Sequence, residues 1–322
     1  MELPRDLLAA MEGLCAGYSS AELGKAYEAL SARYRREGAC DDFRIQSDEE
    51  ALAYVASRLP ATYGAVHKAL AELERLADGF APESVLDIGA GPATATLVAR
   101  DVWPSIDKAH LVEPNVPLAA CGEALMKAMD FVGTYIRGTL QKMPQQEKAD
   151  LVLASYVLNE VPDEAISHGV KTLWDHANDA LVIVETGTPF GYKTLMKARD
   201  ALIGFGAYIA APCPHQMECP IASQEENWCH FSVRIQRSSL HRKIKPSATL
   251  AYEDEKFCYL IALRDPLSNT VAARLIGAPK GGKVLSLPLC RDDGNFEVRQ
   301  TTKRDSDHGV LKRMDWGDAL DK

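Results

Sequence analysis

Four short apolar runs, separated by helical segments, occupy the stretch from residue 81 to about 210. The runs are Ser84–Ile88, Ala109–Val112, Asp150–Ala154 and Leu181–Glu185, each four or five residues long. Runs of this length match buried strands, and the segments between them have room for helical crossovers. Strands alternating with helices are typical of a parallel sheet that is covered by helices on both faces. The sequence therefore predicts a doubly wound α/β core over residues 81–210.

The stretches on either side of this core have different patterns. Residues 1–80 carry apolar residues at helical spacing, as at Leu52, Val55 and Leu59, and predict a helical N-terminal region. Residues 211–322 begin with a Cys-rich insertion, continue with a last core strand over 256–264, and end in a small basic β extension. No apolar run reaches the roughly 20 residues that span a bilayer, and no export signal opens the chain. We therefore expect a cytoplasmic protein.

A glycine turn, Asp87-Ile88-Gly89-Ala90-Gly91, follows the first predicted strand. Glycine lets a ligand approach the backbone closely, and the helix that follows offers free amide groups. A dinucleotide fingerprint needs a third glycine where Thr94 stands, which argues against NAD. The order Asp-x-Gly-x-Gly is instead similar to the first motif of class I methyltransferases, which bind S-adenosylmethionine. The core is therefore expected to have the class I methyltransferase fold, a Rossmann-like doubly wound sheet.

A second carboxylate supports a cofactor site. Glu113 ends the second predicted strand, 26 residues after Asp87, and fits the acid that accepts hydrogen bonds from ribose hydroxyls in such folds. The predicted cofactor-binding residues are Asp87, Gly89, Gly91, Glu113 and, after the third strand and near adenine, Leu140. The simplest alternative is a glycine turn that only packs a strand against a helix.

The acceptor side is predicted from the loop after the fourth strand. Ser155, Tyr156 and Asn159 follow the carboxyl end of that strand, where ligands bind in open α/β sheets. The loop lacks the Pro-Pro-Tyr motif of amine methyltransferases, and no cysteine there is placed to attack a pyrimidine ring. These three side chains are therefore candidates to line the acceptor side, and no residue stands out as a catalytic base.

Three cysteines, Cys213, Cys219 and Cys229, fall within 17 positions of a loop rich in proline and polar residues. Without an export signal a disulfide framework is not expected, so clustered thiols point to a metal. Cys290, at the end of a short strand, is a candidate fourth ligand. The other cysteines are expected to be buried in the core, and they are Cys15, Cys40, Cys121 and Cys258.

The identity of the metal is less sharply defined. Structural zinc sites usually have two to four residues between paired cysteines, and the spacings here are longer. Cys-Pro steps and four thiolates favour an iron–sulfur cluster. A zinc ion held by three cysteines and either His215 or His230 is the alternative to the cluster.

A basic stretch, His230–Lys245, follows the cysteine loop. It has five Lys or Arg residues and no acid, although the chain as a whole has a net charge of -9. The average field of such a protein does not attract nucleic acid, so binding would require a local patch. A solvated face without a partner is the alternative reading. The predicted RNA-binding residues are Arg234, Arg237, Arg242, Lys243 and Lys245.

Several motifs together resemble one known family. They are Arg58–Tyr63, Leu86–Pro92, Ser155–Glu160, Glu185–Pro189, Pro212–Pro220, Trp228–Phe231, Tyr252–Phe257 and Trp316–Asp318. Over most of its length the chain resembles the small-ribosomal-subunit methyltransferase-like family, whose mitochondrial members, of the methyltransferase-like protein seventeen type, are small-subunit assembly factors. The resemblance implies bound S-adenosylmethionine, contact with small-subunit ribosomal RNA, and a 4Fe-4S cluster on Cys213, Cys219, Cys229 and Cys290. Because no targeting segment is seen, it also implies a bacterial-type member.

The combined prediction is a methyltransferase-like protein with a metal-stapled C-terminal extension. It is expected to bind small-subunit ribosomal RNA or the pre-ribosomal small subunit during ribosome assembly, to be a monomer when free, and to transfer methyl groups. Two alternatives stay open. One is a non-catalytic assembly factor that keeps the cofactor as a structural ligand, which the missing Pro-Pro-Tyr motif favours. The other is a small-molecule methyltransferase.

Overall fold

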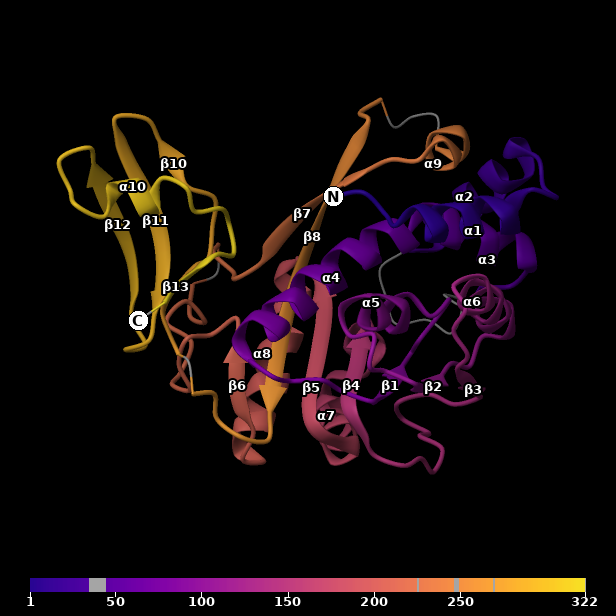
Figure 1. Cartoon of the computed structure of the whole chain (residues 1–322), viewed down its shortest axis with the longest axis horizontal. Helices are drawn as coiled ribbons and strands as arrows, with labels where there is room; N and C mark the ends of the chain where they lie inside the picture. The colour runs from indigo at the N-terminus through magenta and orange to yellow at the C-terminus, as the bar shows by residue number, and fades with distance from the viewer. Residues whose placement is uncertain (35–44, 225, 246–248, 269, 322) are drawn as a thin grey trace.

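A computed structural model describes residues 1–34, 45–224, 226–245, 249–268 and 270–321 (Figure 1). Its larger sheet has eight strands in the order β3-β2-β1-β4-β5-β8-β6, with β7 paired to β8. These strands are β1 (Ser84–Ile88), β2 (Lys108–Val112), β3 (Thr134–Ile136), β4 (Ala149–Ser155), β5 (Ala177–Thr186), β6 (Tyr208–Ala211), β7 (Phe231–Gln236) and β8 (Tyr252–Leu263).

The order of the strands identifies the core. Strands β1 to β5 pair in parallel, whereas β8 runs antiparallel to β5 and β6, between which it lies, and also to β7. An antiparallel strand inserted between the fifth and sixth strands of such a sheet is the class I methyltransferase arrangement, so the predicted fold of the core is confirmed. The register places Ile88 beside Val112 and Ala154. The carboxyl ends of β1, β2 and β4 therefore meet at one edge of the sheet.

Helices cover both faces of the sheet (Figure 1). One face carries α4 (Leu59–Leu76), α5 (Thr94–Val102) and α6 (Val116–Ala128), and the other carries α7 (Ile166–His176) and α8 (Pro189–Gly204). The strands alternate between the two cores, so that Val182 of β5 packs in the first and Ile183 in the second. Two short 3₁₀ helices, Leu158–Glu160 and Asp163–Ala165, follow β4.

Three more helices complete the N-terminal region, α1 (Arg5–Cys15), α2 (Ser20–Tyr34) and α3 (Asp48–Ser57). The Ser47 side chain caps α3 by accepting a hydrogen bond from the amide of Glu50. Pro60 lies in the first turn of α4, where a missing amide costs no helical hydrogen bond. No helix in the described part of the chain is both long and apolar enough to cross a membrane.

The basic stretch after the cysteine loop is regular structure. It forms β7, which pairs antiparallel with the first half of β8, followed by the short helix α9 (Ser239–Ile244). The β7–β8 pair extends beyond the sheet and carries α9 to the side of α2 and α3 (Figure 1). The second half of β8, from Phe257 to Leu263, is the part that pairs with β5.

The C-terminal module is a separate five-stranded sheet with its own small core. Its elements are β9 (Val271–Leu275), β10 (Lys280–Gly281), β11 (Val284–Arg291), β12 (Phe296–Thr302), α10 (His308–Leu311) and β13 (Ala319–Asp321). The strand order is β10-β11-β9-β13, with β12 on β11. The module core consists of Ala273, Leu275, Leu287, Leu289, Leu311 and Met314.

Arg274 of β9 ties this module to the rest of the molecule. Its side chain is 1% exposed and forms an ion pair with Glu72 of α4. Its guanidinium also donates to the carbonyl oxygens of Pro212 and Gly317, each at 3.0 Å. One buried cation therefore joins α4, the cysteine loop and the C-terminal segment.

Candidate cofactor and metal sites

The predicted cofactor loop lies between β1 and α5. Gly89 and Gly91 have φ angles of 71° and 52°, values that favour glycine. A Cβ on Gly89 would lie 2.3 Å from Cγ2 of Val157, which follows β4. Glycine is therefore required at position 89 both by its backbone conformation and by the close approach of the neighbouring loop.

Asp87 and Glu113 hold the two sides of this turn. Oδ2 of Asp87 accepts hydrogen bonds from the amide and the hydroxyl of Thr96, at 3.2 and 2.8 Å. The Glu113 carboxylate accepts from the amide of Gly91 at 2.8 Å and from the amide of Asn115 at 2.8 Å. The two acids and the glycine turn thus lie together at the adjacent ends of β1 and β2.

Tyr135 of β3 adds a contact that the sequence reasoning missed. Its hydroxyl donates to the carbonyl oxygen of Gly91 at 2.8 Å, so both polar groups of the Gly91 backbone are held. Gly122 of α6 leaves room for this side chain, because a Cβ there would lie 1.8 Å from the Tyr135 hydroxyl. An aromatic residue in a three-residue strand has no spacing that would separate this role from core packing.

Leu140, predicted to lie near adenine, belongs to the core beside α7. It is 4% exposed, and a Cβ on Gly169 would lie 3.1 Å from its Cδ2. Its side chain packs in the core between the sheet and α7, and its place near adenine stays a prediction.

Both acids of the turn are deeply buried, with Asp87 0% and Glu113 9% exposed. Burial raises the pKa of Asp87 to about 6 and that of Glu113 to about 7, because it disfavours the charged carboxylate. Oδ1 of Asp87 is buried without a hydrogen-bond partner among the described residues. A ligand with positive charge would stabilise both carboxylates, so the turn suits a cationic ligand.

Ser155, Tyr156 and Asn159 lie at or just beyond the carboxyl end of β4. Tyr156 has a φ of 62°, a conformation that is uncommon for a residue with a side chain and often marks a functional site. Its amide donates to the carbonyl oxygen of Val184 at 2.7 Å. Nδ2 of Asn159 donates to the Thr186 hydroxyl at 3.1 Å, and its Oδ1 is buried with no partner in the described ranges.

Glu185, at the end of β5, supports this loop and was not among the predicted site residues. Its Oε1 accepts hydrogen bonds from the amides of Leu158 and Asn159, at 2.7 and 3.3 Å. The side chain is fully buried, and burial raises its pKa to about 8. The only sequence signal for it was its position at a strand end.

The substitution Glu185→Gln tests this assignment. The folded chain keeps the Glu185 proton up to about pH 8, whereas the unfolded chain releases it near pH 4.5. The folded state therefore binds more protons between these values, and this residue makes stability fall as pH rises. Glutamine retains the accepting oxygen without titrating. Urea unfolding measures the free energy of unfolding of both proteins. Between about pH 6 and 8 we expect the value for the variant to rise relative to that of wild type by up to about 1.4 kcal/mol per pH unit. Free energies of unfolding that change with pH in the same way in both proteins would contradict the assignment.

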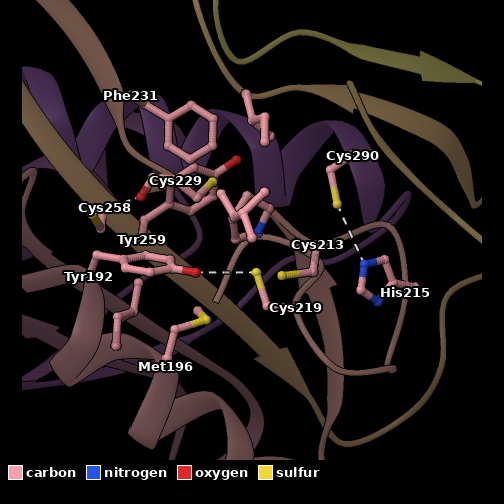
Figure 2. Close-up of a pocket in the computed structure, with 14 residues that line it drawn as sticks. Tyr192, Met196, Cys213, His215, Cys219, Cys229, Phe231, Cys258, Tyr259 and Cys290 are labelled. Atoms are coloured by element: carbon pink, nitrogen blue, oxygen red, sulfur yellow. Dashed lines mark hydrogen bonds between the residues drawn. The ribbon is translucent and has the colours of Figure 1, made fainter. Parts of the chain in front are cut away.

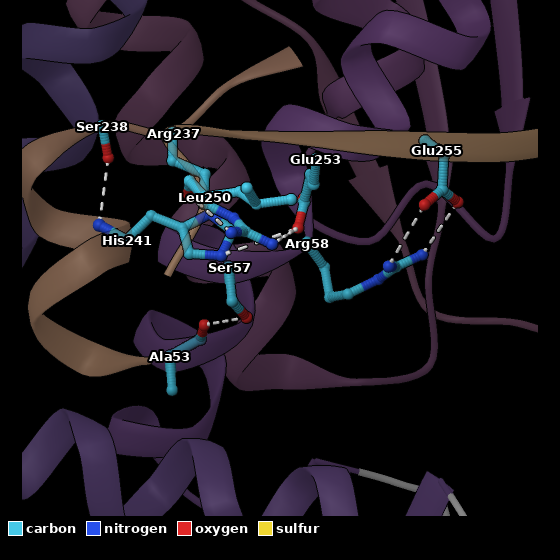
Figure 3. Close-up of polar contacts among 9 residues, drawn as sticks. All are labelled: Ala53, Ser57, Arg58, Arg237, Ser238, His241, Leu250, Glu253 and Glu255. Carbon is cyan, nitrogen blue, oxygen red and sulfur yellow. Dashed lines mark hydrogen bonds and ion pairs between the residues drawn. The ribbon is translucent and has the colours of Figure 1, made fainter. Parts of the chain in front are cut away.

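The Tyr156 side chain is anchored by a charged pair. Its hydroxyl donates to Oε1 of Glu255 on β8 at 3.1 Å. The guanidinium of Arg58 donates to both Glu255 oxygens, at 3.2 and 3.5 Å (Figure 3). Arg58 lies at the junction of α3 and α4. The acceptor-side loop is thus connected to the N-terminal helices through one carboxylate.

The four predicted metal ligands line a single cavity of about 30 Å³ (Figure 2). They are Cys213 and Cys219 in the loop after β6, Cys229 before β7, and Cys290 on β11. Sγ of Cys219 lies 3.2 Å from the Tyr192 hydroxyl, and Sγ of Cys290 lies 3.4 Å from Nε2 of His215. Across the described ranges, no three His, Cys, Asp or Glu side chains are arranged to hold a metal ion. The four thiols therefore line one cavity, but their positions do not form a coordination site for a metal ion.

Two polar side chains fix the shape of the cysteine loop. Arg199 of α8 is 1% exposed and donates to the carbonyl oxygens of His215 and Met217, at 3.1 and 2.7 Å. The Gln216 amide exchanges two hydrogen bonds with the backbone of Ile209, at 2.9 and 2.8 Å. The loop is therefore held by protein contacts at two points beside the cavity.

Burial favours the neutral thiol at three of the four predicted metal ligands. It raises the pKa of Cys213, of Cys229 and of Cys290, and a bound metal would reverse this effect. Cys15, Cys121 and Cys258 are buried, as predicted, whereas Cys40 lies outside the described residues. Cys258 also lines the cavity, where its thiol donates to the carbonyl oxygen of Cys229 at 3.2 Å.

Two of the five predicted RNA-binding residues, Arg234 and Arg237, form ion pairs that the composition of the basic stretch did not indicate. Arg234 lies opposite Asp254 in the β7–β8 register and forms two hydrogen bonds with it, at 2.7 and 2.8 Å. Arg237 bonds Glu253 at 3.4 Å and the carbonyl oxygen of Leu250 at 2.8 Å (Figure 3). Acids on β8 therefore neutralise both arginines.

The remaining three predicted cations lie on and just after α9. Arg242 and Lys243 are exposed, while the Lys245 ammonium lies 5.6 Å from the ring centre of Tyr27 on α2. The predicted basic surface is thus reduced to the outer side of one short helix.

Solved structures with similar folds include a magnesium protoporphyrin IX methyltransferase from Synechocystis PCC 6803 with bound SAH. It is 14% identical, with a TM-score of 0.42, covering 74% of this chain and 93% of that one. A putative RNA methyltransferase from Pyrococcus horikoshii is 11% identical, with a TM-score of 0.42, covering 68% of this chain and 98% of that one.

Curated relatives include the ribosome assembly protein METTL17, mitochondrial, of Homo sapiens. It is 28% identical over 292 residues, which cover 84% of this chain and 62% of that protein. The ribosome assembly protein RSM22, mitochondrial, of Saccharomyces cerevisiae is 23% identical over 299 residues, covering 62% of this chain and 47% of that protein. The chain thus spans less than two thirds of each of these relatives. The family model described as mitochondrial small ribosomal subunit Rsm22 matches residues 48–321. The chain belongs to the Rsm22 family.

Proposed function

We propose that this protein is a ribosome assembly factor that binds S-adenosylmethionine and small-subunit ribosomal RNA and carries a 4Fe-4S cluster. Its family membership over residues 48–321 is the observation that carries the assembly role, because two curated relatives are named as ribosome assembly proteins. The cofactor, the cluster and the RNA surface are supported by separate features of this chain.

The glycine turn supports the cofactor. Gly89 and Gly91 give close access to the backbone, Glu113 fits a ribose, and Asp87 has a buried oxygen without a partner among the described residues. The cofactor would supply an electrophilic methyl group on a sulfonium. Its positive charge suits the buried acids of the turn. Tyr135 would keep the turn in the shape that binds it, and Ser155, Tyr156 and Asn159 would face the acceptor.

The cysteine cavity supports the cluster. Cys213, Cys219, Cys229 and Cys290 surround one apolar space, and four thiolates are the usual ligands of a 4Fe-4S cluster. The charge of the thiolates would be offset by buried arginines nearby, Arg199 and Arg274. Zinc on three cysteines and His215 is the alternative, since Nε2 of His215 lies 3.4 Å from the Cys290 sulfur. We propose that the metal completes the staple between the core and the C-terminal module.

Iron and sulfide analysis of protein purified without oxygen tests the metal. We expect a brown protein with four irons per chain and an absorption band at about 400 nm from thiolate–iron charge transfer. Cys213→Ser should lose most of the iron. Cys258→Ser is the matched control, because Cys258 lines the same cavity and is not a proposed ligand. A colourless protein with one zinc would replace the iron assignment with zinc.

RNA binding is tested on α9. Replacing Arg242, Lys243 and Lys245 together by Gln should weaken binding to small-subunit RNA. It should also make the fall of log K with log salt less steep by about 2 to 3, because each lost phosphate contact removes about 0.7 to 0.9 from the slope. Arg234→Gln, whose guanidinium is already paired with Asp254, is the control and should change the slope little. Weak binding that does not depend on salt would support a small-molecule methyltransferase.

Whether methyl groups are transferred is a separate question. A nucleotide-resolution map of modified positions in small-subunit RNA, from cells with and without the protein, answers it. A methylation lost with the protein, and restored by wild type but not by Gly89→Ala, would assign catalysis. An unchanged map with defective subunits favours the alternative, a non-catalytic factor that keeps the cofactor as a structural ligand.

A further inference from the structure

Three aromatic rings meet where the cysteine loop and the C-terminal module reach the sheet. The rings of Trp228 and His230 are stacked, with centroids 5.0 Å apart and planes 20° from parallel. The ring of Trp316 meets His230 edge-on, with centroids 4.7 Å apart. All three side chains are only partly buried. Trp316 packs against one core of the sheet and Trp228 against the other, and each ring keeps part of its surface exposed.

Hydrogen bonds fix this group at the carboxyl edge of the sheet. Nε1 of Trp228 donates to the carbonyl oxygen of Gly187, the residue after β5, at 2.9 Å. The amide of Gly187 in turn donates to the carbonyl oxygen of Lys256 on β8, also at 2.9 Å. Ligands of open α/β sheets bind outside the carboxyl ends of the strands. The rings thus lie on the side of the sheet that carries the glycine turn and the acceptor loop.

Positive charge and one unused donor accompany the rings. Lys256 is exposed and lies opposite Ser232 in the β7–β8 register, two residues along the chain from His230. Nζ of Lys68 donates to the carbonyl oxygen of Trp316 at 3.1 Å. Nε1 of Trp316 is buried and has no hydrogen-bond partner in the part of the chain that the structure describes. A buried indole N–H normally finds an acceptor, so its lack of one calls for an explanation.

We propose that Trp228, His230 and Trp316 form a binding site for an unpaired nucleobase of RNA, with Lys256 contacting the neighbouring phosphate. An unpaired base has a free ring face for stacking and a free Watson–Crick edge with acceptors for the Trp316 N–H, whereas a base within a duplex has both ring faces stacked and that edge paired. Stacking on an aromatic side chain is a common mode of single-strand recognition, and cations beside the rings hold the backbone. The inference rests on the proposed RNA binding and adds to it a preference for unpaired RNA.

Photocrosslinking to the intact protein tests the site directly. A single-stranded oligonucleotide with one 4-thiouridine is irradiated with the protein, and the crosslinked residue is identified by mass spectrometry. We expect crosslinks at Trp228, His230 or Trp316. Crosslinks confined to α9, or to other surfaces away from the rings, would overturn the proposal.

Binding measurements with matched variants give a second test. Trp316→Ala should weaken binding to single-stranded RNA about tenfold, as expected for loss of one stacked base, and binding to a fully paired duplex of equal length less than twofold. Trp316→Phe should recover most of the single-strand affinity. Trp103→Phe, a buried tryptophan elsewhere in the fold, is the control and should change neither.

The outcomes separate this inference from the proposed function. If wild-type protein binds no RNA at any salt concentration, the proposed function itself fails. If RNA binds and the α9 variant weakens it, but Trp316→Ala leaves single-strand binding unchanged, only the nucleobase site is wrong. Equal losses for single-stranded RNA and a fully paired duplex would also overturn the site, because they would indicate that Trp316 only supports the fold.

Discussion

Arg274→Met is expected to lower the free energy of unfolding by about 3 to 5 kcal/mol, the cost of removing one partner from a buried ion pair. The guanidinium is 1% exposed and holds Glu72 as well as the carbonyl oxygens of Pro212 and Gly317. Methionine fills much of the space and supplies none of these donors. Among the described residues Glu72 keeps only its contact with the half-exposed Arg75, so a carboxylate that is 12% exposed and two carbonyls lose partners.

Urea unfolding of wild type and variant measures this effect. Arg299→Met is the matched control, because Arg299 pairs with Asp307 on the surface of the same module and both side chains are about 40% exposed. Exposed pairs contribute about 0 to 1 kcal/mol, so the control should unfold almost like wild type. If Arg274→Met cost no more than Arg299→Met, the module would be held by its other contacts and Arg274 would not be its anchor.

The sequence was sufficient to predict the parts of the fold that depend on local pattern. The Ser84–Ile88 run is the strand β1, and the runs at 109–112, 150–154 and 181–185 lie within β2, β4 and β5. Such strands are buried on both faces and read as continuous apolar runs. The glycine turn after β1 was identified for the same reason, since its residues are adjacent in the chain.

Features that depend on pairing between distant segments were missed. Arg234 on β7 and Arg237 just after it are paired with Asp254 and Glu253, which lie 20 and 16 residues further along the chain. Register between two strands cannot be read from either strand alone. The roles of Tyr135 and Arg58 were missed for the same reason, because their partners Gly91 and Glu255 belong to other elements.

Composition predicted some residues of the cysteine site and not others. Four cysteines could be grouped because thiols in a proline-rich loop have few other roles, and all four do line one cavity. Composition did not show that Cys258, expected in the core, would line the same cavity, or that Arg199 would hold the loop. A buried arginine in the middle of α8 has no spacing that distinguishes it from a surface residue.

Gly89→Ala is expected to weaken S-adenosylmethionine binding at least about thirtyfold. A side chain at φ 71° costs about 1 to 2 kcal/mol, and the new Cβ would lie 2.3 Å from Cγ2 of Val157, which adds about 1 to 3 kcal/mol of overpacking. The turn can relieve the backbone strain and the steric clash only by changing shape, and the changed shape no longer leaves its backbone open to the ligand. Binding must then restore that shape, and calorimetry of the purified variant measures the cost.

Two further variants separate the backbone effect from the steric one. Gly79→Ala is the matched control, because Gly79 has a φ of 80° but a Cβ there would meet nothing within 4 Å, and it lies before β1, away from the turn. It should lose some stability and keep its affinity. Adding Val157→Ala to Gly89→Ala removes the steric clash alone and should recover part of the binding. If Gly89→Ala bound the cofactor as wild type does, the turn between β1 and α5 would not be the cofactor site, and the buried acids Asp87 and Glu113 would need another explanation.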